Sequence, residues 1–438
     1  MTARHTPIAN PSVAECAAAT SPWQRWRWPL LIGAGAALCA LGAGLGASGF
    51  ALVRSPTDFG VYYAAARVLV AGGDPYNWHA LRQVVPEVPA LGYIYPLWSV
   101  LPILPLTWLP LPAAAGVWLM LNLACLALAV GVLASLVGLP GRSYWLPALS
   151  VLTCLSIPGL FVLIQGQISI MLLAAVLGAF WAAVRGRGAW TGVLIALALV
   201  KPQLTWLPAL VILAVAWRHG GGRAAIGTAS ACLALFALVS FALRPDWLGQ
   251  WIFALREDAA QGGSGAQALR ANMGTIPALA AHLPPPLGVL LLALSLMAGA
   301  ALLIALGRRA LSQSEPRDPW ADATLLAVAI GVGTALSPWM WIYDGVFWLV
   351  PLALAVARGP AWRRWASVVV FWLVPWSIRL WHVASAGGSG TSLNKLEDVV
   401  IAPLLIALLL ITPRTARAPL WLTPAFAKRL ATRWGQRT

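Results

Sequence analysis

Residues 29–53 read PLLIGAGAALCALGAGLGASGFALV, an apolar run without a single charged side chain. A run of this length can cross the hydrocarbon core of a bilayer as an α-helix. It is too long for the core of a signal peptide, and residues 1–28 before it contain no small-residue cleavage pattern. The sequence therefore predicts that this run is the first of a series of membrane helices.

Comparable apolar runs recur as far as residue 412, separated by short basic or Gly- and Pro-rich breaks. Of the 438 residues, 60% are hydrophobic and only 10% are charged, which leaves too few polar side chains to cover a water-soluble globule of this size. We therefore expect an all-α, polytopic membrane protein with about 12 transmembrane helices. Residues 29–412 would form the membrane domain, residues 1–28 an N-terminal tail and residues 413–438 a basic C-terminal tail.

The formal net charge of +16 is distributed in a way that indicates a membrane topology. Lysines and arginines stand singly or in pairs at the ends of the apolar runs, as the positive-inside rule describes for cytoplasmic loops. Nucleic-acid binding is disfavoured, because these residues do not alternate with aromatic residues on a soluble domain. We predict a protein of the bacterial cytoplasmic membrane, with both termini in the cytoplasm and residues 54–92 forming the first outer loop.

Most acidic residues then fall at or near the outer surface, where the majority need only be solvated loop charges. They are Asp58, Asp74, Glu87, Asp246, Glu257, Asp258, Asp344, Glu397 and Asp398.

One apolar segment does not fit this topology. Counting every run as a span gives about 13 crossings, whereas two cytoplasmic termini require an even number. The segment Tyr93 to Pro110 carries four prolines, which would break a regular helix and suit a re-entrant or interfacial piece. Segment Ser143 to Leu163 is the alternative.

The five cysteines indicate neither a disulfide framework nor a zinc site. Cys16 lies in the N-terminal tail and Cys39, Cys125, Cys154 and Cys232 lie in apolar runs, with no CxxC pair. No glycine-rich nucleotide-binding loop follows a predicted strand.

The first outer loop places Asp58 a few residues beyond the first predicted membrane helix. The pattern from Val61 to Val70 predicts a short helix lying on the membrane surface, and Gly72 to Tyr76 are typical of a turn at its exit. A carboxylate held between lipid and aromatic rings can accept a proton from an alcohol, and partial desolvation would raise its basicity. The alternative is that Asp58 only caps the surface helix.

Lys201 interrupts the apolar stretch from Thr191 to Trp217. With Arg187 and Arg218 both cytoplasmic, this stretch must be a hairpin of two short helices whose tip carries Lys201 to the outer side, level with Asp58. The ammonium could bind a lipid phosphate or merely snorkel to the surface. Arg379 and His382, near the outer end of another apolar run, have the same two interpretations.

Further polar and aromatic residues are expected at outer helix ends, where amide and hydroxyl groups suit sugar hydroxyls and an indole can stack on a sugar ring. Each of them taken singly is more often part of an ordinary loop. They are Gln165, Gln167, Asn272, Trp339, Trp341, Tyr343 and Asp344.

Together these motifs resemble glycosyltransferase family 87, the polyprenyl-phosphate-sugar-dependent membrane transferases that include phosphatidylinositol-mannoside mannosyltransferases. The resemblance covers most of the chain, from about Asp58 to Pro351, and lies in the order of several short motifs. These are Asp58-Phe-x-x-Tyr62-Tyr63-x-Ala-Ala, Gly73-Asp-Pro-Tyr76, Tyr95-Pro96, Gly166-Gln167, Lys201-Pro202 and Ser337-Pro338.

The resemblance implies a GT-C fold and inverting transfer of a sugar from a polyprenyl-phosphate donor to a glycolipid or cell-envelope glycan. Asp58 matches the family's base, Lys201 would lie near the donor phosphate, and Tyr62, Tyr63 and Tyr95 would contact sugar or acceptor. No resident cofactor is implied, although a weakly held divalent cation near the phosphate stays open. Mannosyl members often carry histidine where this chain has Tyr343 and Asp344, so the sugar stays open between mannose and arabinofuranose.

A transporter or lipid flippase is the rival class. Such a protein should have paired broken helices in two halves and ionisable residues near the midplane of the membrane. Lys201 has no counterpart in a second half of this sequence, and the charged residues gather at the outer ends.

Overall fold

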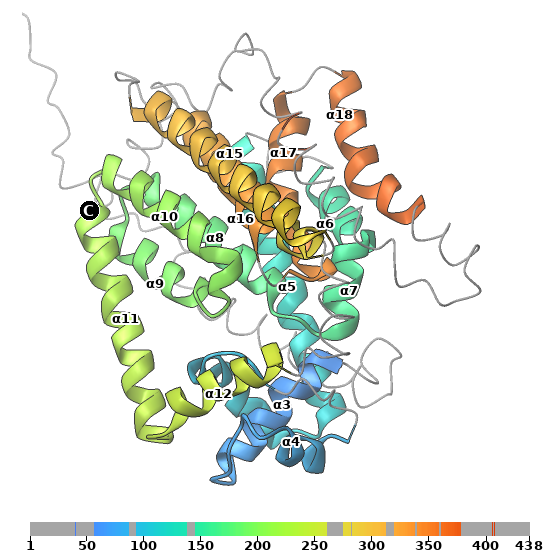
Figure 1. Cartoon of the computed structure of the whole chain (residues 1–438), viewed down its shortest axis with the longest axis vertical. Coiled ribbons are helices and arrows are strands. Elements are labelled where there is room, and N and C mark those ends of the chain that lie inside the picture. Colours follow the sequence, from blue (N-terminus) through green and yellow to red (C-terminus); the bar gives the residue numbers. More distant parts are fainter. Residues whose placement is uncertain are drawn as a thin grey trace, which may run out of the picture.

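The computed structural model shows an all-helical protein (Figure 1). It describes residues 40, 57–86, 93–137, 145–260, 275–281, 283–311, 319–337, 340–358, 361–377, 405 and 407. Within these ranges the chain forms α-helices, two 3₁₀ helices and a π turn, and contains no strand. The predicted all-α class is confirmed, whereas the predicted first membrane helix, apart from residue 40, and both tails lie outside the described residues.

One end of the molecule is built by a group of helices that we call the α3 layer (Figure 1). It comprises α3 (Thr57–Val70), α4 (Trp78–Val84), the 3₁₀ helix η2 (Leu97–Trp108) and α12 (Trp247–Ala260). Helix α3 packs against α4 and along η2. Because α3 begins at Thr57, the helix predicted from Val61 is longer than expected and includes Asp58 in its first turn.

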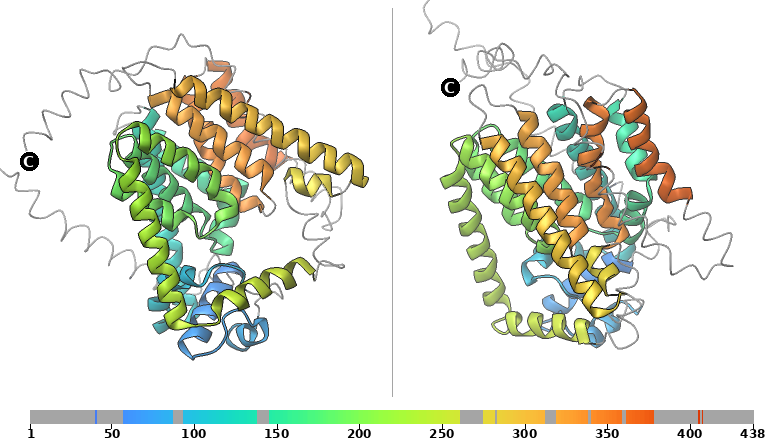
Figure 2. Two further views of the ribbon diagram at one scale, coloured as in Figure 1. Left: turned by 60° about the vertical axis from the view of Figure 1, so that its left-hand side comes forward. Right: turned by 45° about the horizontal axis from the view of Figure 1, so that its top comes forward.

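The remaining helices form a bundle above the α3 layer (Figures 1 and 2). Helix α8 packs against α5, α9 and α10, α11 packs along α9, and α16 packs against α10 and α15. The helices are α5 (Leu111–Val137), α6 (Trp145–Leu155), α7 (Ile157–Gln165), α8 (Ser169–Ala183), α9 (Gly188–Ala198), α10 (Pro202–Arg218), α11 (Gly222–Leu243), α14 (Ile276–Ala280), α15 (Pro285–Leu311), α16 (Pro319–Leu336), η4 (Ile342–Trp348), α17 (Leu349–Arg358), α18 (Ala361–Val368) and the π turn η5 (Val369–Leu373).

Three described helices are long and apolar enough to cross a membrane, namely Leu111–Leu136, Gly222–Leu243 and Pro285–Arg308. Only 11% and 6% of the most apolar window of the second and third is buried inside the protein, so most residues of these windows keep accessible surface, as lipid contact requires. The pair α7 and α8 is a fourth candidate, bent by 115° at a short break. The predicted total of about 12 crossings stays a prediction.

The two alternative candidates for the segment that does not cross the membrane are both irregular. The segment from Tyr93 to Pro110 forms the 3₁₀ helix η2, with Pro102 and Pro105 inside it, because proline removes the N–H that an α-helix needs. The rival segment is divided into α6 and α7 at Ser156, whose hydroxyl accepts from Gly159 N and caps α7. That the segment from Tyr93 to Pro110, rather than its alternative, does not cross the membrane stays a prediction.

A buried ion cluster joins α10 to α16 at the end of α10 that is farthest from Lys201. Asp322 is 0% exposed and binds the guanidinium of Arg218, while its Oδ2 lies 3.1 Å from His219 Nε2. Breaking such a contact would leave a buried carboxylate without a cation. The contact therefore fixes α10, and with it the helix start that positions Lys201.

Candidate active site

Asp58 lies in the first turn of α3, and its carboxylate is bound by a residue from the bundle. Gln167 Nε2 donates to Asp58 Oδ2 over 2.8 Å. The side-chain partner of Asp58 therefore comes from a segment 109 residues away rather than from the start of its own helix. Asp58 as a whole residue is partly exposed, whereas Gln167 is buried.

Gln167 is held by the break between α7 and α8. Helix α7 ends at Gly166, which has a φ of 67° in the left-handed region that glycine adopts without strain. The carbonyl of Gly166 accepts from Trp118 Nε1 over 2.7 Å, and Tyr62 Oη donates to Gln167 Oε1 over 2.8 Å. Gln167 is 2% exposed, so its amide is fixed by these neighbours.

Lys201 marks the break between α9 and α10, as the interrupted apolar stretch predicts. Pro202 occupies the first position of α10, where the missing N–H costs no helical hydrogen bond. The Lys201 ammonium is buried and donates to Asp344 Oδ1 over 2.7 Å, and it lies 4.8 Å from the centre of the Tyr343 ring. The snorkelling interpretation is therefore not supported, because the ammonium points into the protein.

Asp344 is the second carboxylate of the site and is fully buried. Its Oδ1 also accepts from Ser169 Oγ over 2.6 Å, and its Oδ2 accepts from the backbone N–H of Trp341 over 3.2 Å at the start of η4. Asp344 thereby joins the start of α8, the α9–α10 break and η4. The two carboxylates Asp58 and Asp344 have different environments, since only Asp344 is neutralised by a bound cation.

Burial raises the pKa of Asp58 to about 6. The hydrogen bond from Gln167 and the charge of Lys201 oppose this rise, and the charge of Asp344 adds to it. Ser169, two residues after Gln167, binds Asp344, so the connection between α7 and α8 links Asp58 to the pair of Lys201 and Asp344. A carboxyl group with a pKa near 6 is ionised at neutral pH and is a stronger base than an ordinary aspartate.

Aromatic rings surround Asp58 and Gln167. Tyr62 meets Tyr95 edge-on with ring centres 5.3 Å apart, and it contacts Tyr93 and Trp118 at 6.4 Å each. Tyr63 lies on the same helix but donates its hydroxyl to Leu109 O, which fastens α3 to the end of η2. The tyrosine that binds Gln167 therefore lies in an aromatic cluster next to Asp58 on α3.

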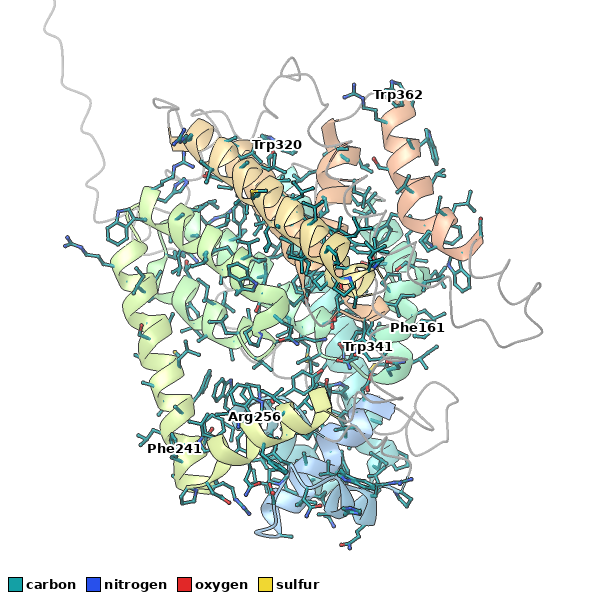
Figure 3. All side chains as sticks on the ribbon, viewed as in Figure 1. Phe161, Phe241, Arg256, Trp320, Trp341 and Trp362 are labelled. Atoms are coloured by element: carbon teal, nitrogen blue, oxygen red, sulfur yellow. The ribbon has the colours of Figure 1, made fainter. Side chains whose placement is uncertain are left out.

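The other predicted sugar-binding residues lie at different distances from this cluster. Trp341 is partly buried and stacks on Tyr343 with ring centres 6.3 Å apart, and Figure 3 shows it between the bundle and the α3 layer. Gln165 is partly exposed at the end of α7. Asn272, Trp339, Arg379 and His382 lie outside the described residues.

Two members of the cluster were not predicted from the sequence, namely Ser169 and Trp118. Ser169 follows the Gly166-Gln167 motif by two residues and could have been included on that ground. Trp118 lies within the long apolar helix α5, about two turns from its start, and its neighbours in the sequence give no polar signal that would single it out.

The described ranges contain no group of three or more His, Cys, Asp or Glu side chains that could hold a metal ion. Within them, Cys125, Cys154 and Cys232 are free thiols.

A comparison with protein-family models finds one match, to glycosyltransferase family 87, over residues 93–338. The matched region is more than half of the chain and includes Tyr95, Gln167 and Lys201, whereas Asp58 and Asp344 flank it. No curated protein and no solved structure matches the chain.

Proposed function

The chain belongs to glycosyltransferase family 87, and from this premise we propose that it transfers mannose or arabinofuranose from a polyprenyl-phosphate donor to a hydroxyl group of a glycolipid or cell-envelope glycan. Membership in this family implies a membrane glycosyltransferase. We further propose the donor, the acceptor and the inversion of configuration at the anomeric carbon. The observation that carries it is the Asp58 carboxylate, held by Gln167 in one cluster with the buried pair of Lys201 and Asp344.

In the proposed reaction Asp58 acts as the general base. Its Oδ2 is engaged by Gln167, so Oδ1 takes the proton from the acceptor hydroxyl. The acceptor oxygen attacks the anomeric carbon from the face opposite the leaving group, which inverts the configuration there. The bond between that carbon and the phosphate oxygen breaks, and its electron pair leaves with the polyprenyl phosphate.

Lys201 is proposed to stabilise the phosphate as its negative charge increases. An ammonium group has three N–H donors, and the bond to Asp344 uses one of them. Arg379 and His382 are proposed to assist at the same phosphate. A cation placed where negative charge develops lowers the barrier without requiring a metal, although a weakly bound divalent cation stays an alternative.

The site is proposed to face the periplasm or exterior, with both termini in the cytoplasm. Helix α9 begins directly after Arg187 and helix α10 ends at Arg218, whereas Lys201 lies at the opposite end of both helices. If the arginines are cytoplasmic, Lys201 and the cluster around it face outward. This orientation supports a donor whose lipid chain lies in the outer part of the bilayer.

The test is Asp58→Asn in proteoliposomes supplied with polyprenyl-phosphate mannose or polyprenyl-phosphate arabinofuranose and a glycolipid acceptor. We expect sugar transfer to fall by about 10²–10⁴-fold, the usual contribution of a general base. Asp74→Asn is the matched control, because Asp74 lies in the same predicted outer loop and its side chain accepts only from the nearby Tyr76 N–H in the described contacts. Near-wild-type transfer by a folded Asp58→Asn protein would overturn the assignment.

A further inference from the structure

We infer that Gln167 is a positioning residue for Asp58, and that the Tyr62 hydroxyl sets the orientation of the Gln167 amide. The two residues would then act through the base rather than by binding sugar. This inference rests on the proposed function, because it assigns Asp58 the role of base. It is carried by a chain of two hydrogen bonds, from Tyr62 Oη to Gln167 Oε1 and from Gln167 Nε2 to Asp58 Oδ2, each 2.8 Å long.

The two ends of the Gln167 side-chain amide are chemically different but similar in shape. The oxygen only accepts hydrogen bonds and the NH₂ group only donates them, so rotation by half a turn exchanges the two functions. A hydroxyl that donates to Oε1 favours one orientation, in which the NH₂ group faces Asp58. Tyr62 Oη donates such a hydrogen bond to Gln167 Oε1 and therefore favours this orientation.

The selected orientation favours the ionised form of Asp58. An N–H donor directed at Oδ2 stabilises a carboxylate, and the hydrogen bond from Gln167 indeed opposes the rise in the pKa of Asp58 that burial causes. With the amide reversed, Oε1 would face a carboxylate oxygen, and the two acceptors would repel each other. By fixing the Gln167 amide, Tyr62 therefore stabilises the ionised form of Asp58, which a general base requires.

The hydrogen bonds that the Gln167 amide already makes distinguish this role from direct sugar binding. Gln167 is 2% exposed and Tyr62 is 4% exposed, and the hydrogen bonds between Tyr62, Gln167 and Asp58 use the amide oxygen and one amide N–H. Asp58, in contrast, keeps partial exposure.

The backbone around Gln167 supports a fixed position. The preceding Gly166 adopts a left-handed conformation, and its carbonyl is held by Trp118 Nε1. Two residues later, Ser169 Oγ binds the carboxylate that pairs with Lys201. The short connection between α7 and α8 thus sets the positions of both carboxylates of the site.

The experiment measures the pH dependence of kcat/KM for Tyr62→Phe and Gln167→Leu in the reconstituted transfer assay. Tyr62→Phe keeps the ring that packs against Tyr95 and Trp118 and removes only the hydroxyl. For Tyr62→Phe we expect kcat to fall about tenfold with little change in the KM of donor or acceptor. The acidic limb of its pH profile, where kcat/KM falls with decreasing pH, should move to higher pH. Gln167→Leu should move the acidic limb of the pH profile to higher pH by about one unit, because it removes a hydrogen bond to the ionised Asp58 carboxylate.

Tyr76→Phe is the control for the loss of a buried tyrosine hydroxyl, because the Tyr76 hydroxyl donates to the backbone carbonyl of Tyr95. Its acidic limb should coincide with that of the wild type. Melting curves establish that each variant is folded, and a second substitution at position 167, Gln167→Met, serves if the leucine variant is not.

Unchanged acidic limbs in Tyr62→Phe and in a folded variant at position 167 would overturn the inference. A raised KM without a shift of the limb would also overturn it and would indicate direct substrate contact. Failure of the proposed function has a different signature, since Asp58→Asn would then keep its turnover. If Asp58→Asn is inactive while the Tyr62 and Gln167 variants resemble the wild type, only the positioning role is wrong.

Discussion

Lys201 Nζ lies 2.7 Å from Asp344 Oδ1, although the two residues are 143 positions apart in the chain. Both side chains are almost completely inaccessible, with exposed fractions of 3% and 0%. The pair joins the break between α9 and α10 to the start of η4, and Ser169 adds the start of α8. The contact is therefore both a structural joint and part of the proposed phosphate site, and these two roles can be separated by mutation.

Lys201→Met should destabilise the protein strongly, because it leaves Asp344 as a buried charge without its cation. Removing one partner of a buried ion pair typically costs about 3–5 kcal/mol. Thermal unfolding in detergent measures the loss, and sugar transfer should also fall. Asp246→Asn is the control, because its pair with Arg244 is exposed and should contribute little to the melting temperature.

The double variant Lys201→Met/Asp344→Asn separates the two roles. It should regain part of the lost melting temperature, since no unpaired charge remains, but it should not regain transfer. Equal melting temperatures for Lys201→Met and the Asp246→Asn control would contradict the structural role of the pair.

The pH dependence of transfer should reflect the raised pKa of Asp58. A base must be ionised, and the pKa of Asp58 is about 6, so kcat/KM should decline about tenfold per pH unit below that value and level off above pH 7 or so. Initial rates between pH 4.5 and 8 in proteoliposomes, with constant ionic strength, test this. An acidic limb near the ordinary aspartate value would contradict the partly desolvated environment of Asp58.

The raised pKa of Asp58 should affect the stability of the protein in the opposite direction to its activity, so stability should fall as pH rises. The folded protein binds the Asp58 proton more tightly than the unfolded chain does, so the contribution of Asp58 to stability is fully present below about pH 4 and is lost as pH rises through about 6. Asp58→Asn removes the charge, so its melting temperature should exceed that of the wild type at pH 8. The difference should shrink as the pH approaches 4, and a difference independent of pH would contradict the prediction.

The sequence was informative about polar residues because the surrounding chain is so apolar. Asp58, Gln167 and Lys201 each stand where an apolar run ends, and a charged or amide group is costly in such a position unless it has a partner or a function. The structure brings these three residues together, as the shared outer position predicts. Helix breaks at Pro102, Pro105 and Lys201 were predictable for the same local reasons.

The partners of these residues could not be read from local patterns. Gln167 binds Asp58 from 109 positions away and Asp344 binds Lys201 from 143 positions away, and the hydrophobic period of a helix carries no information about such contacts. Sequence reasoning therefore assigned Gln167 and Asp344 to sugar binding, without seeing that each is bound to another polar residue of the cluster. The start of α3 at Thr57 was missed because Thr57 and Asp58 precede the apolar period from which the helix was predicted.

Gly166→Ala tests whether the connection between α7 and α8 positions the site. An alanine in the left-handed conformation, here at a φ of 67°, costs about 1–2 kcal/mol, and relief of that strain would move Gln167 away from Asp58. Gly220→Ala is a matched control, because Gly220 also has a left-handed φ, of 80°, and an added Cβ there would meet no atom within 4 Å. Gly220 follows Arg218 and His219, which contact Asp322 at the end of α10 that is far from Lys201. Both variants should lose similar melting temperature, whereas only Gly166→Ala should lose turnover and shift the acidic limb of its pH profile upward. Equal turnover in the two variants would show that the base does not depend on this connection for its position.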